Sequence, residues 1–337
     1  MKILEMAAPE KMTLREVPEP ENRPGCAKIR MEYCGICGSD LTAYAGRNPT
    51  VKYPVAGIGH EGIGVIEEIG ENSRGLRPGD RVALEPYIPC RKCRMCAVER
   101  FNNCMDIRVA GVHTGGMMAG AVVFPVELLH RVPDGLDPLD AALTEPLTIG
   151  LHAASRASVS PGERCVITGA GPIGLLAALG VKSRGAEPIL VDVVEDRLRF
   201  ARQCGIDRTF NSAGGDLSAY LQETAGGLPQ AMLDCTGSPA ILAAMHDYVC
   251  HGGRIALVGW PKGPVTVNTV RCIQKELDIH PSRNSNKQFP AALSLIASGA
   301  VPARKIITKV VGLEEVEAVM LDMTAHPGDY MKVVVRL

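Results

Sequence analysis

The pattern of hydrophobic and polar positions changes character near residue 161. Before this point, short runs alternate apolar with polar residues or are rich in β-branched residues, and turn sequences such as Arg77-Pro78-Gly79-Asp80 separate them. This pattern of short runs separated by turns is typical of β-strands. After this point, apolar runs alternate with stretches of helical spacing, which indicates a parallel sheet covered by helices. The chain therefore predicts a mostly β N-terminal part followed by an α/β part.

The same patterns place the individual elements. In the N-terminal part they predict strands over residues 27–33, 62–69 and 81–84. In the α/β part they predict strands over 164–168, 188–193, 232–235, 254–258 and 277–280, with helices over 172–183 and 195–204. A helix over 291–298 and a strand over 332–336 close the chain. The length of 337 residues fits two domains, since one domain per roughly 150 residues is usual.

Composition and charge narrow the class of partner. Hydrophobic residues make up 46% and charged residues 22% of the chain, as in ordinary globular proteins. The formal net charge of −1 excludes a whole-chain electrostatic surface for nucleic acid or anionic membrane. No uncharged stretch reaches the about 20 apolar residues that a spanning helix needs, and the N-terminus lacks the apolar core of a signal peptide. We therefore expect a small-molecule partner, no membrane and no nucleic acid.

Cysteine usage bears on both compartment and metal binding. Twelve cysteines in a chain without a secretory signal are metal ligands or reduced thiols more often than disulfides, which predicts a cytoplasmic location. Four of them, Cys90, Cys93, Cys96 and Cys104, form C-x2-C-x2-C-x7-C in a basic loop. Closely spaced soft ligands suit a tetrahedral structural zinc site, although spacing alone leaves an iron–sulfur cluster as the competing interpretation. We predict a metal-binding lobe over about residues 88–106.

A glycine-rich turn follows the first predicted strand of the α/β part. Gly169, Gly171 and Gly174 form G-x-G-x-x-G between that strand and a helix that begins near Pro172 and Ile173. The first glycine permits a tight turn, the second a close approach of the pyrophosphate, and the third close packing of the helix. The N-terminus of the helix favours the phosphate charge. This segment predicts a dinucleotide site.

An acidic residue at the end of the next strand indicates which dinucleotide binds. Asp192 lies close to the roughly 20-residue offset at which a carboxylate holds the ribose 2′-hydroxyl. A carboxylate would repel the 2′-phosphate of NADP, so Asp192 favours NAD. Arg197 is a nearby arginine that could instead accommodate that phosphate, and a solvated strand end is the alternative explanation of Asp192.

Two short N-terminal segments contain further metal-ligating residues. Cys37 follows the first predicted strand, and His60 and Glu61 precede the second. Cys37, His60 and an acidic residue would form a zinc site of sulfur, nitrogen and oxygen ligands, and mixed sites with an open position are the catalytic kind. A thioredoxin-type dithiol of Cys34 and Cys37 is set aside, because the pair follows an apparent all-β segment.

Together these motifs resemble the zinc-containing medium-chain dehydrogenase/reductase family over nearly the whole chain. Gly59-His60-Glu61-x-x-Gly64 is similar to its zinc signature, and segments 78–82 and 90–104 are similar to its turn-strand and structural zinc lobe. Segment 145–150 is similar to the polyol, sugar-acid and threonine dehydrogenase branch. The resemblance implies a GroES-like catalytic domain over residues 1–147, a Rossmann doubly wound parallel sheet domain over 148–284, and a return to the catalytic domain over 285–337.

The resemblance also implies roles for individual residues. The residues expected around a catalytic zinc are Cys37, His60, Glu61 and Glu145. Water and one of the two carboxylates, Glu61 or Glu145, would exchange at the zinc ion as substrate enters. Ser39 would relay the proton, although it could instead cap a helix that begins near Asp40. Two zinc ions and one NAD per chain are therefore expected, in a homodimer or homotetramer formed through the strand predicted over 277–280.

The expected reaction is hydride transfer to NAD from a secondary alcohol of a polyol or sugar acid. Val258 ends a strand beside which relatives hold the nicotinamide, and Arg283 lies in a loop that faces the substrate in relatives. Arg283 could pair with a substrate carboxylate or with the cofactor, or be a surface arginine. Thr42 stands where many threonine and polyol dehydrogenases have histidine, which weakens the alternative of a threonine 3-dehydrogenase. A non-catalytic NAD- and zinc-binding regulator is the alternative from another class.

Overall fold

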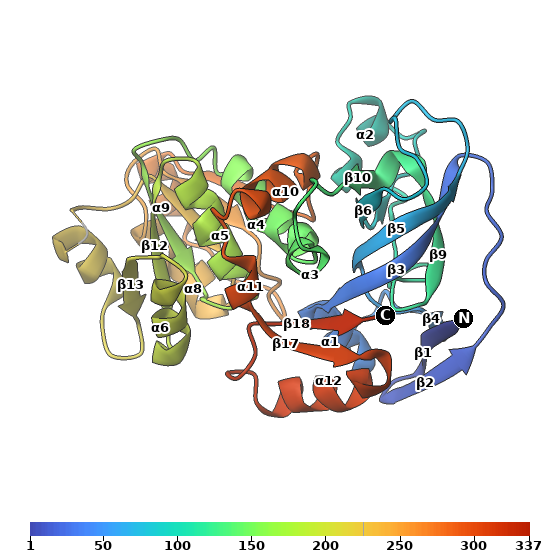
Figure 1. Ribbon diagram of the computed structural model, residues 1–337. Helices are drawn as coiled ribbons and strands as arrows, with labels where there is room; N and C mark the ends of the chain where they lie inside the picture. The colour runs from blue at the N-terminus through green and yellow to red at the C-terminus, as the bar shows by residue number, and fades with distance from the viewer. Residues whose placement is uncertain (225) are drawn as a thin grey trace. The chain divides into compact units, whose positions relative to one another are not determined.

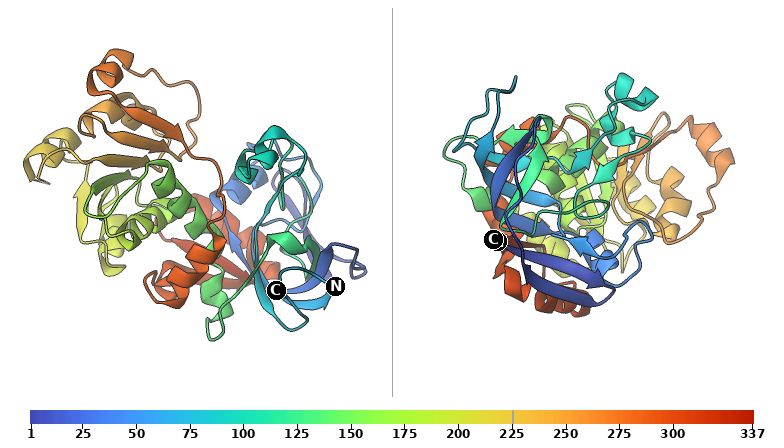
Figure 2. Two further views of the ribbon diagram at one scale, coloured as in Figure 1. Left: turned by 90° about the horizontal axis from the view of Figure 1, so that it is seen from above. Right: turned by 90° about the vertical axis from the view of Figure 1, so that its right-hand side faces the viewer.

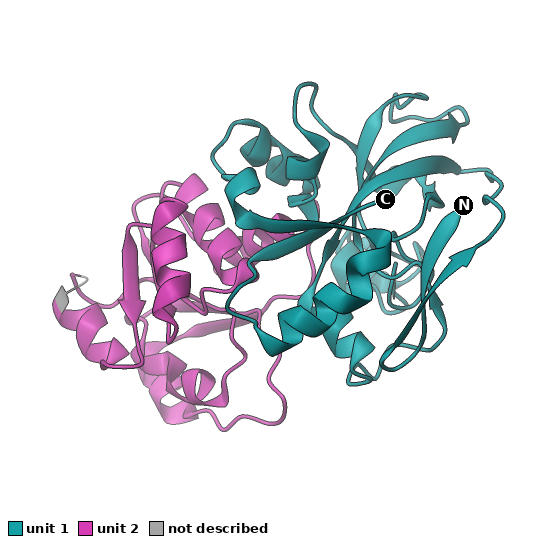
Figure 3. Ribbon diagram, turned by 60° about the horizontal axis from the view of Figure 1, so that its bottom comes forward, with its two compact units in different colours: residues 1–145, 289–337 teal, residues 146–288 magenta. Residues whose placement is uncertain are grey.

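The computed structural model describes residues 1–224 and 226–337, which form two compact units. Unit 1 comprises Met1–Glu145 and Phe289–Leu337, and unit 2 comprises Pro146–Gln288 (Figure 3). The chain leaves unit 1 inside helix α4 (Thr144–Arg156) and re-enters it at helix α10 (Phe289–Ala297). These crossings lie within a few residues of the boundaries expected from the sequence. No helix in the described ranges has the length and apolar character needed to cross a bilayer.

Unit 1 is organised around β3, the long strand that pairs with neighbours on both sides (Figure 1). One side pairs with β5, and the other pairs first with β9 and then with the C-terminal strand β18. Within the described residues the main order is β10-β6-β5-β3-β18-β17. Its strands are β3 (Cys26–Ile36), β5 (Glu61–Ile69), β6 (Arg81–Leu84), β9 (Ala121–Pro125), β10 (Leu129–Arg131), β17 (Ile307–Gly312) and β18 (Lys332–Arg336).

Smaller elements complete unit 1. A second sheet joins β1 (Lys2–Ala8), β2 (Lys11–Glu16) and β4 (Val55–Ala56), and a short ribbon joins β7 (Tyr87–Ile88) and β8 (Arg108–Val109). The helices are α1 (Gly38–Tyr44), α2 (Arg94–Ala97), α3 (Pro138–Ala141), α11 (Ala303–Ile306) and α12 (Val316–Ala325), with 3-10 turns at Phe101–Asn103, Val126–Leu128 and Leu313–Glu315.

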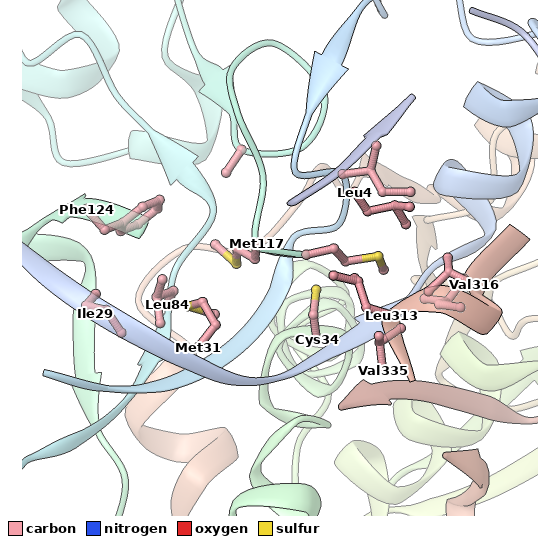
Figure 4. Close-up of a cluster of buried hydrophobic side chains, with 14 of the residues drawn as sticks. Leu4, Ile29, Met31, Cys34, Leu84, Met117, Phe124, Leu313, Val316 and Val335 are labelled. Carbon is pink, nitrogen blue, oxygen red and sulfur yellow. The ribbon is translucent and has the colours of Figure 1, made fainter. Parts of the chain in front are cut away.

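The core of unit 1 joins residues from both ends of the chain (Figure 4). Ile29 and Met31 are buried on alternate positions of β3, because successive side chains of a strand point to opposite faces. Cys34, further along β3, is paired in register with Val335 of β18, and both are fully buried. Met117 packs into the same cluster. The last strand of the chain therefore completes the core of the first domain.

Unit 2 is a parallel sheet with helices between its strands (Figure 2). The strand order of its described residues is β13-β12-β11-β14-β15-β16, which is the 3-2-1-4-5-6 order of the Rossmann fold. The strands are β11 (Arg164–Thr168), β12 (Glu187–Asp192), β13 (Arg208–Asn211), β14 (Ala231–Asp234), β15 (Arg254–Leu257) and β16 (Asp278–Pro281). The helices are α5 (Pro172–Ser183), α6 (Glu195–Gln203), α7 (Leu217–Ala219), α8 (Pro239–Ala244) and α9 (Thr269–Lys275), with a π turn at Tyr220–Thr224 and a 3-10 turn at Met245–Asp247.

Two helices of unit 2 approach each other at a glycine. A Cβ at Gly150 of α4 would lie 2.6 Å from backbone atoms of Ala177 in α5, which is closer than real contacts allow. The glycine in segment 145–150 is therefore explained by helix packing within unit 2.

The strongest sequence patterns coincide with observed elements. The expected elements over 81–84, 164–168, 172–183 and 332–336 match β6, β11, α5 and β18 residue for residue. The sequence does not predict α4, because Pro146 and Gly150 disfavour helix interiors, yet Pro146 lies in the first turn where proline is tolerated. It also misses β13, a short and half-buried edge strand with little periodicity.

Candidate metal centres and dinucleotide site

The pairing of β3 with β5 brings three candidate ligands together in unit 1. Cys37 directly follows β3, His60 directly precedes β5, and Glu61 is paired in register with Gly35. One ligand atom from each of Cys37, His60 and Glu61 lies within 4.8 Å of the other two. His60 and Glu61 are buried, and Cys37 is half-buried. A single ion can therefore contact all three side chains.

Glycine is required opposite Glu61. A Cβ built on Gly35 would lie 1.8 Å from Glu61 Oε2, so any larger residue would displace the carboxylate. The sheet register and the missing side chain at Gly35 together fix where Glu61 can lie.

Asp40 supports both Cys37 and His60. One carboxylate oxygen accepts a hydrogen bond from the Cys37 N–H at 2.9 Å, and the other lies 3.6 Å from His60 Nδ1. Burial disfavours the charged imidazole, but Asp40 and Cys37 outweigh this and raise the pKa of His60 well above its ordinary value. Since the two ring nitrogens face in different directions, Nε2 is left for a metal ion. A carboxylate behind a ligand histidine is the usual way to orient the ring.

Lys332 neutralises Glu61 inside the protein. Its Nζ lies 2.6 Å from Oε1 and 2.5 Å from Oε2 of Glu61, and it also donates to the Ile36 carbonyl at 3.0 Å. Both side chains are almost completely buried. Burial alone would lower the pKa of Lys332, but the charges of Glu61 and Cys37 raise it. Lys332 comes from β18, so the C-terminal segment contributes directly to this group.

Glu145 has a different partner. It is buried in the first turn of α4, and its Oε1 accepts a hydrogen bond from the buried Tyr87 hydroxyl. Burial raises the pKa of Glu145 to about 7, and the charge of His60 opposes that rise. Burial, followed by the charge of Glu145, raises the pKa of Tyr87 well above its ordinary value. Among the described residues, the compact ligand group contains Cys37, His60 and Glu61 and does not include Glu145.

Ser39 lies beside the ligand group, in the first turn of α1. The helix begins at Gly38, so the cap position belongs to Cys37, and the interpretation of Ser39 as a helix cap is wrong. Helix α1 begins earlier than expected because Asp40, at its third position, accepts from the Cys37 backbone. Thr42 donates its hydroxyl to the Ser39 carbonyl at 2.9 Å within the same helix.

The mixed ligand group fits a catalytic zinc ion chemically. Cys37, His60 and Glu61 offer one sulfur, one nitrogen and one oxygen donor. Zinc accepts each of these donors, and three protein ligands leave a fourth tetrahedral position for substrate or water.

The four-cysteine lobe has the dimensions of a site for one ion. The sulfurs of Cys90, Cys93, Cys96 and Cys104 all lie within 4.8 Å of one another, and Cys93 Sγ is 3.6 Å from Cys96 Sγ and 3.9 Å from Cys104 Sγ. A tetrahedron with Zn–S bonds of about 2.3 Å separates its sulfurs by about 3.8 Å. An iron–sulfur cluster would have to place several iron atoms among the four sulfurs. The spacing therefore favours a single zinc ion.

Backbone groups make this lobe receptive to a cation. Hydrogen bonds from the backbone N–H groups of Met105 and Cys96 lower the pKa of Cys93 to about 6. Burial instead raises the pKa of Cys96 to about 12. The Arg91 guanidinium stacks 4.6 Å from the centroid of Phe101.

The glycine-rich turn of unit 2 shows the steric requirements expected of it. Gly169 has φ +92°, a conformation that favours glycine. A Cβ at Gly174 would lie 1.7 Å from the Gly169 carbonyl oxygen, so glycine is needed where α5 meets the turn. A Cβ at Gly171 would contact no described atom within 4 Å, so internal packing does not explain this glycine. Pro172 and Ile173 begin α5.

Asp192 ends β12 beside this turn. Its carboxylate accepts hydrogen bonds from the N–H of Ala170 at 2.6 Å and from the N–H of Val194 at 2.9 Å. Arg197 Nη1 lies 3.8 Å from Asp192 Oδ2. The structure therefore brings Asp192 and Arg197 together at the predicted nucleotide turn, with the carboxylate held by the backbone.

Asp234 at the end of β14 supports the same edge of the sheet and was not identified from the sequence. It is fully buried and accepts from the hydroxyls of Thr168 and Thr236 and from the Gly237 N–H. Val258 follows β15 and donates its N–H to the Asp234 carbonyl at 2.9 Å. The sequence did contain a signal for Asp234, because it is an acidic residue at the carboxyl end of a predicted central strand.

Arg283 lies in the loop after β16 and is exposed. In the same loop, the hydroxyls of Ser282 and Ser285 are buried and have no hydrogen-bond partner among the described residues.

Two family models match the chain. Residues 23–134 match the alcohol dehydrogenase GroES-like domain, and residues 172–298 match the zinc-binding dehydrogenase domain. An uncharacterized zinc-type alcohol dehydrogenase-like protein of Haemophilus influenzae is 40% identical over 335 residues, which cover 99% of this chain and 98% of the relative. The chain belongs to the zinc-containing alcohol dehydrogenase family. The predicted family and the predicted fold class, a Rossmann domain with a GroES-like domain, are confirmed.

Two of the relatives are named for a sugar-acid or a polyol substrate. L-idonate 5-dehydrogenase of Vitis vinifera is 33% identical, and the matched region covers 94% of this chain and 90% of that relative. Sorbitol dehydrogenase of Halalkalibacterium halodurans is 36% identical, and the matched region covers 88% of this chain and 87% of that relative. The crystal structure of RspB, an alcohol dehydrogenase of Escherichia coli CFT073 complexed with NADH, superposes with a TM-score of 0.94 at 28% identity, covering 100% of this chain and 99% of that one.

Proposed function

We propose that this chain is an NAD-dependent dehydrogenase that oxidises a secondary alcohol of a polyol or sugar acid and binds two zinc ions. The observation that carries the proposal is the convergence of Cys37, His60 and Glu61 within 4.8 Å, from segments separated in the sequence. Membership of the alcohol dehydrogenase family supports the reaction class, and the L-idonate and sorbitol dehydrogenases support the substrate class.

Each residue of the mixed group has a distinct role in the proposed reaction. A zinc ion bound there would supply Lewis acidity that lowers the pKa of a substrate hydroxyl, and bound NAD would supply the hydride acceptor. Cys37, His60 and Glu61 hold the ion, and Glu145 is the second carboxylate available to it. Lys332 balances the charge of Glu61. Ser39, in the turn beside Cys37, takes the hydroxyl proton and passes it outward.

NAD is the proposed dinucleotide because Asp192 is held in place at the end of β12. Both of its oxygens accept backbone hydrogen bonds, so the carboxylate cannot turn away from a ribose bound at the turn. A 2′-phosphate there would face this fixed negative charge. The nearby Arg197 offsets part of that charge, so the size of the preference for NAD over NADP has to be measured. The proposed cofactor contacts are Gly169, Gly171, Pro172, Ile173, Gly174, Asp192, Arg197, Val258 and Arg283.

A substrate panel with metal analysis of the same sample tests the proposal. Sugar alcohols, aldonates and L-threonine are offered with NAD or NADP, and formation of the reduced cofactor is followed by absorbance. We expect turnover of a polyol or aldonate with NAD and two zinc ions per chain. Turnover of threonine alone would establish the threonine dehydrogenase alternative. Binding of NADH by a protein that contains one zinc ion and turns nothing over would establish the regulator.

Arg283 distinguishes the two substrate classes. A guanidinium that binds a substrate carboxylate does so bidentately, and lysine does not reproduce that geometry. If the substrate is a sugar acid, we expect Arg283→Lys to raise KM for the aldonate and leave KM for an uncharged polyol unchanged. An equal effect on both substrates would exclude a carboxylate contact.

The assembly and the compartment remain proposals. In unit 2, β16 is the outer strand of the described sheet, so its free edge can pair with a second copy. Light scattering of the purified chain should give the mass of a dimer or tetramer. A monomer at all concentrations would contradict the proposed assembly. The cytoplasmic location expected from the sequence stays a prediction.

A further inference from the structure

Asp234 is a completely buried carboxylate at the end of β14. It accepts hydrogen bonds from the Thr168 hydroxyl at 2.8 Å, from the Thr236 hydroxyl at 2.6 Å and from the Gly237 N–H at 3.0 Å. These donors suit an ionised carboxylate, which only accepts, and all of them are neutral. Within the described residues, no lysine, arginine or histidine side chain forms an ion pair with Asp234. Its negative charge is therefore held by dipoles and is not cancelled by an opposite charge.

The loop after β14, residues 235–238, turns its backbone donors toward this carboxylate. The N–H of Thr236 lies 3.2 Å from Asp234 Oδ1, and the N–H of Ser238 donates to the Thr236 hydroxyl at 2.9 Å. With Gly237, three consecutive N–H groups are used inside the protein. Outward N–H groups are what make a loop or a helix terminus attract an anion. A loop built around its own internal anion suits a neutral or cationic group instead.

The position of this loop along the sheet indicates which part of a bound dinucleotide it would face. Thr236 packs on the dinucleotide turn, since a Cβ at Gly169 would lie 2.9 Å from Thr236 Cγ2. The strands run in the order β12-β11-β14-β15, with Asp192 at the end of β12 and the turn after β11. A dinucleotide with its adenosine ribose at Asp192 and its pyrophosphate at the turn therefore continues toward β14 and β15. The 235–238 loop would then face the nicotinamide half.

We propose that the buried charge of Asp234 shifts the affinity of the dinucleotide site toward the oxidised cofactor. The proposal rests on the proposed function, because it requires a nicotinamide dinucleotide at the turn. The oxidised nicotinamide ring is a cation and the reduced ring is neutral, and a charge buried in the protein attracts a cation without touching it. This shift favours alcohol oxidation, because that reaction begins with binding of the oxidised cofactor and ends with release of the reduced one.

The test is Asp234→Asn, which removes the charge and keeps the shape of the side chain. Calorimetry gives Kd for NAD⁺, for NADH and for ADP-ribose, which lacks the nicotinamide ring. The ratio of Kd for NAD⁺ to Kd for NADH should rise on the order of fivefold, which corresponds to about 1 kcal/mol of charge–charge interaction. Both cofactors contain the pyrophosphate, so its repulsion by Asp234 cancels in this ratio. ADP-ribose should bind no more weakly than it does to the unaltered protein.

The matched control is Glu163→Gln. Glu163 directly precedes β11 and pairs at 2.6 Å with Arg254, the first residue of β15, so this variant removes a carboxylate from the opposite edge of the same sheet. Its ratio of the two Kd values should equal that of the unaltered protein. An equal rise in Glu163→Gln and Asp234→Asn would overturn the proposal, because the position of the charge would then not matter.

Thr168→Val gives a second measurement that does not depend on the folding of Asp234→Asn. It keeps the charge of Asp234 and removes one of the hydroxyls that screen it, so the ratio of Kd for NAD⁺ to Kd for NADH should fall. A rise in this ratio would overturn the proposal.

Two results of Asp234→Asn would also contradict the proposed role. An unchanged ratio would show that the charge does not act on the nicotinamide ring. Equal weakening of NAD⁺, NADH and ADP-ribose would show that Asp234 only shapes the 235–238 loop. Failure of the proposed function is distinguishable, because the unaltered protein would then bind neither the cofactors nor ADP-ribose.

Discussion

The two candidate metal centres of unit 1 differ in how the chain assembles them. The four cysteines of the lobe lie between residues 90 and 104, so one loop with the short helix α2 brings all the ligands together. The mixed group instead needs β3 to pair with β5, and its charge balance needs β18 from the end of the chain. The lobe is a local structure, and the mixed group is a product of the tertiary fold.

Their surroundings differ in the same way. Cys93 of the lobe is supported by backbone N–H groups, which come with any loop of suitable shape. The mixed group is supported by side chains, because Asp40 lies beside His60 and Lys332 forms an ion pair with Glu61. A closed set of identical ligands can fix structure, but only an adjustable set surrounded by charges can exchange a ligand for substrate.

The sharpest separation of the two centres should come from Cys37→Ser. It weakens the mixed site and leaves the lobe intact, so kcat/KM should fall by about a thousandfold or more, since a catalytic metal contributes several kcal/mol. Zinc content should drop by one per chain, with little change in the thermal unfolding midpoint. Retention of both zinc ions and of activity would show that the mixed group is not the catalytic centre.

The complementary change is Cys93→Ser in the lobe. Loss of a structural metal is among the largest single-residue effects on stability, and we expect the free energy of unfolding to fall by more than about 4 kcal/mol. Denaturant titration measures this, and zinc analysis should again show the loss of one ion. Folded molecules at low temperature should retain most of their turnover. A variant as stable as the original would mean that the lobe does not depend on its metal.

Lys332→Met tests the charge balance of the mixed group. It leaves Glu61 buried without its cation, and breaking such a pair costs about 3 kcal/mol or more of the free energy of unfolding. The matched control is Lys2→Met, since Lys2 lies 2.6 Å from Glu314 but both are exposed, and exposed pairs contribute little. Equal stabilities of the two variants in denaturant titrations would contradict the role assigned to Lys332.

Gly35→Ala should have the smallest effect of the four. The added methyl group would collide with Glu61 Oε2, and overpacking of this kind costs about 1 to 3 kcal/mol. The control is Gly38→Ala, because a Cβ at Gly38 meets no described atom within 4 Å. We expect lowered stability and weaker zinc binding in the first variant alone. Indistinguishable variants would mean that Glu61 has room to move.

Much of the architecture followed from local patterns. The parallel sheet of unit 2 and its glycine turn were predictable because apolar runs, helical spacing and glycines act within short segments. Helix α4 was missed because its proline and glycine look unfavourable until Pro146 is known to lie in the first turn and Gly150 to pack on α5. The helix-capping role of Ser39 was wrong, because the helix begins at Gly38 and Cys37 occupies the cap position.

The sequence by itself determined the ligand types, the four-cysteine loop and the dinucleotide turn, since each depends on residues close together in the chain. Tertiary structure alone decided that Lys332 neutralises Glu61 and that Tyr87 binds Glu145. Neither pair is marked by spacing or periodicity, because strand pairing and burial bring together residues from distant segments. A buried carboxylate must find a partner, and only the folded chain shows which side chain is within reach.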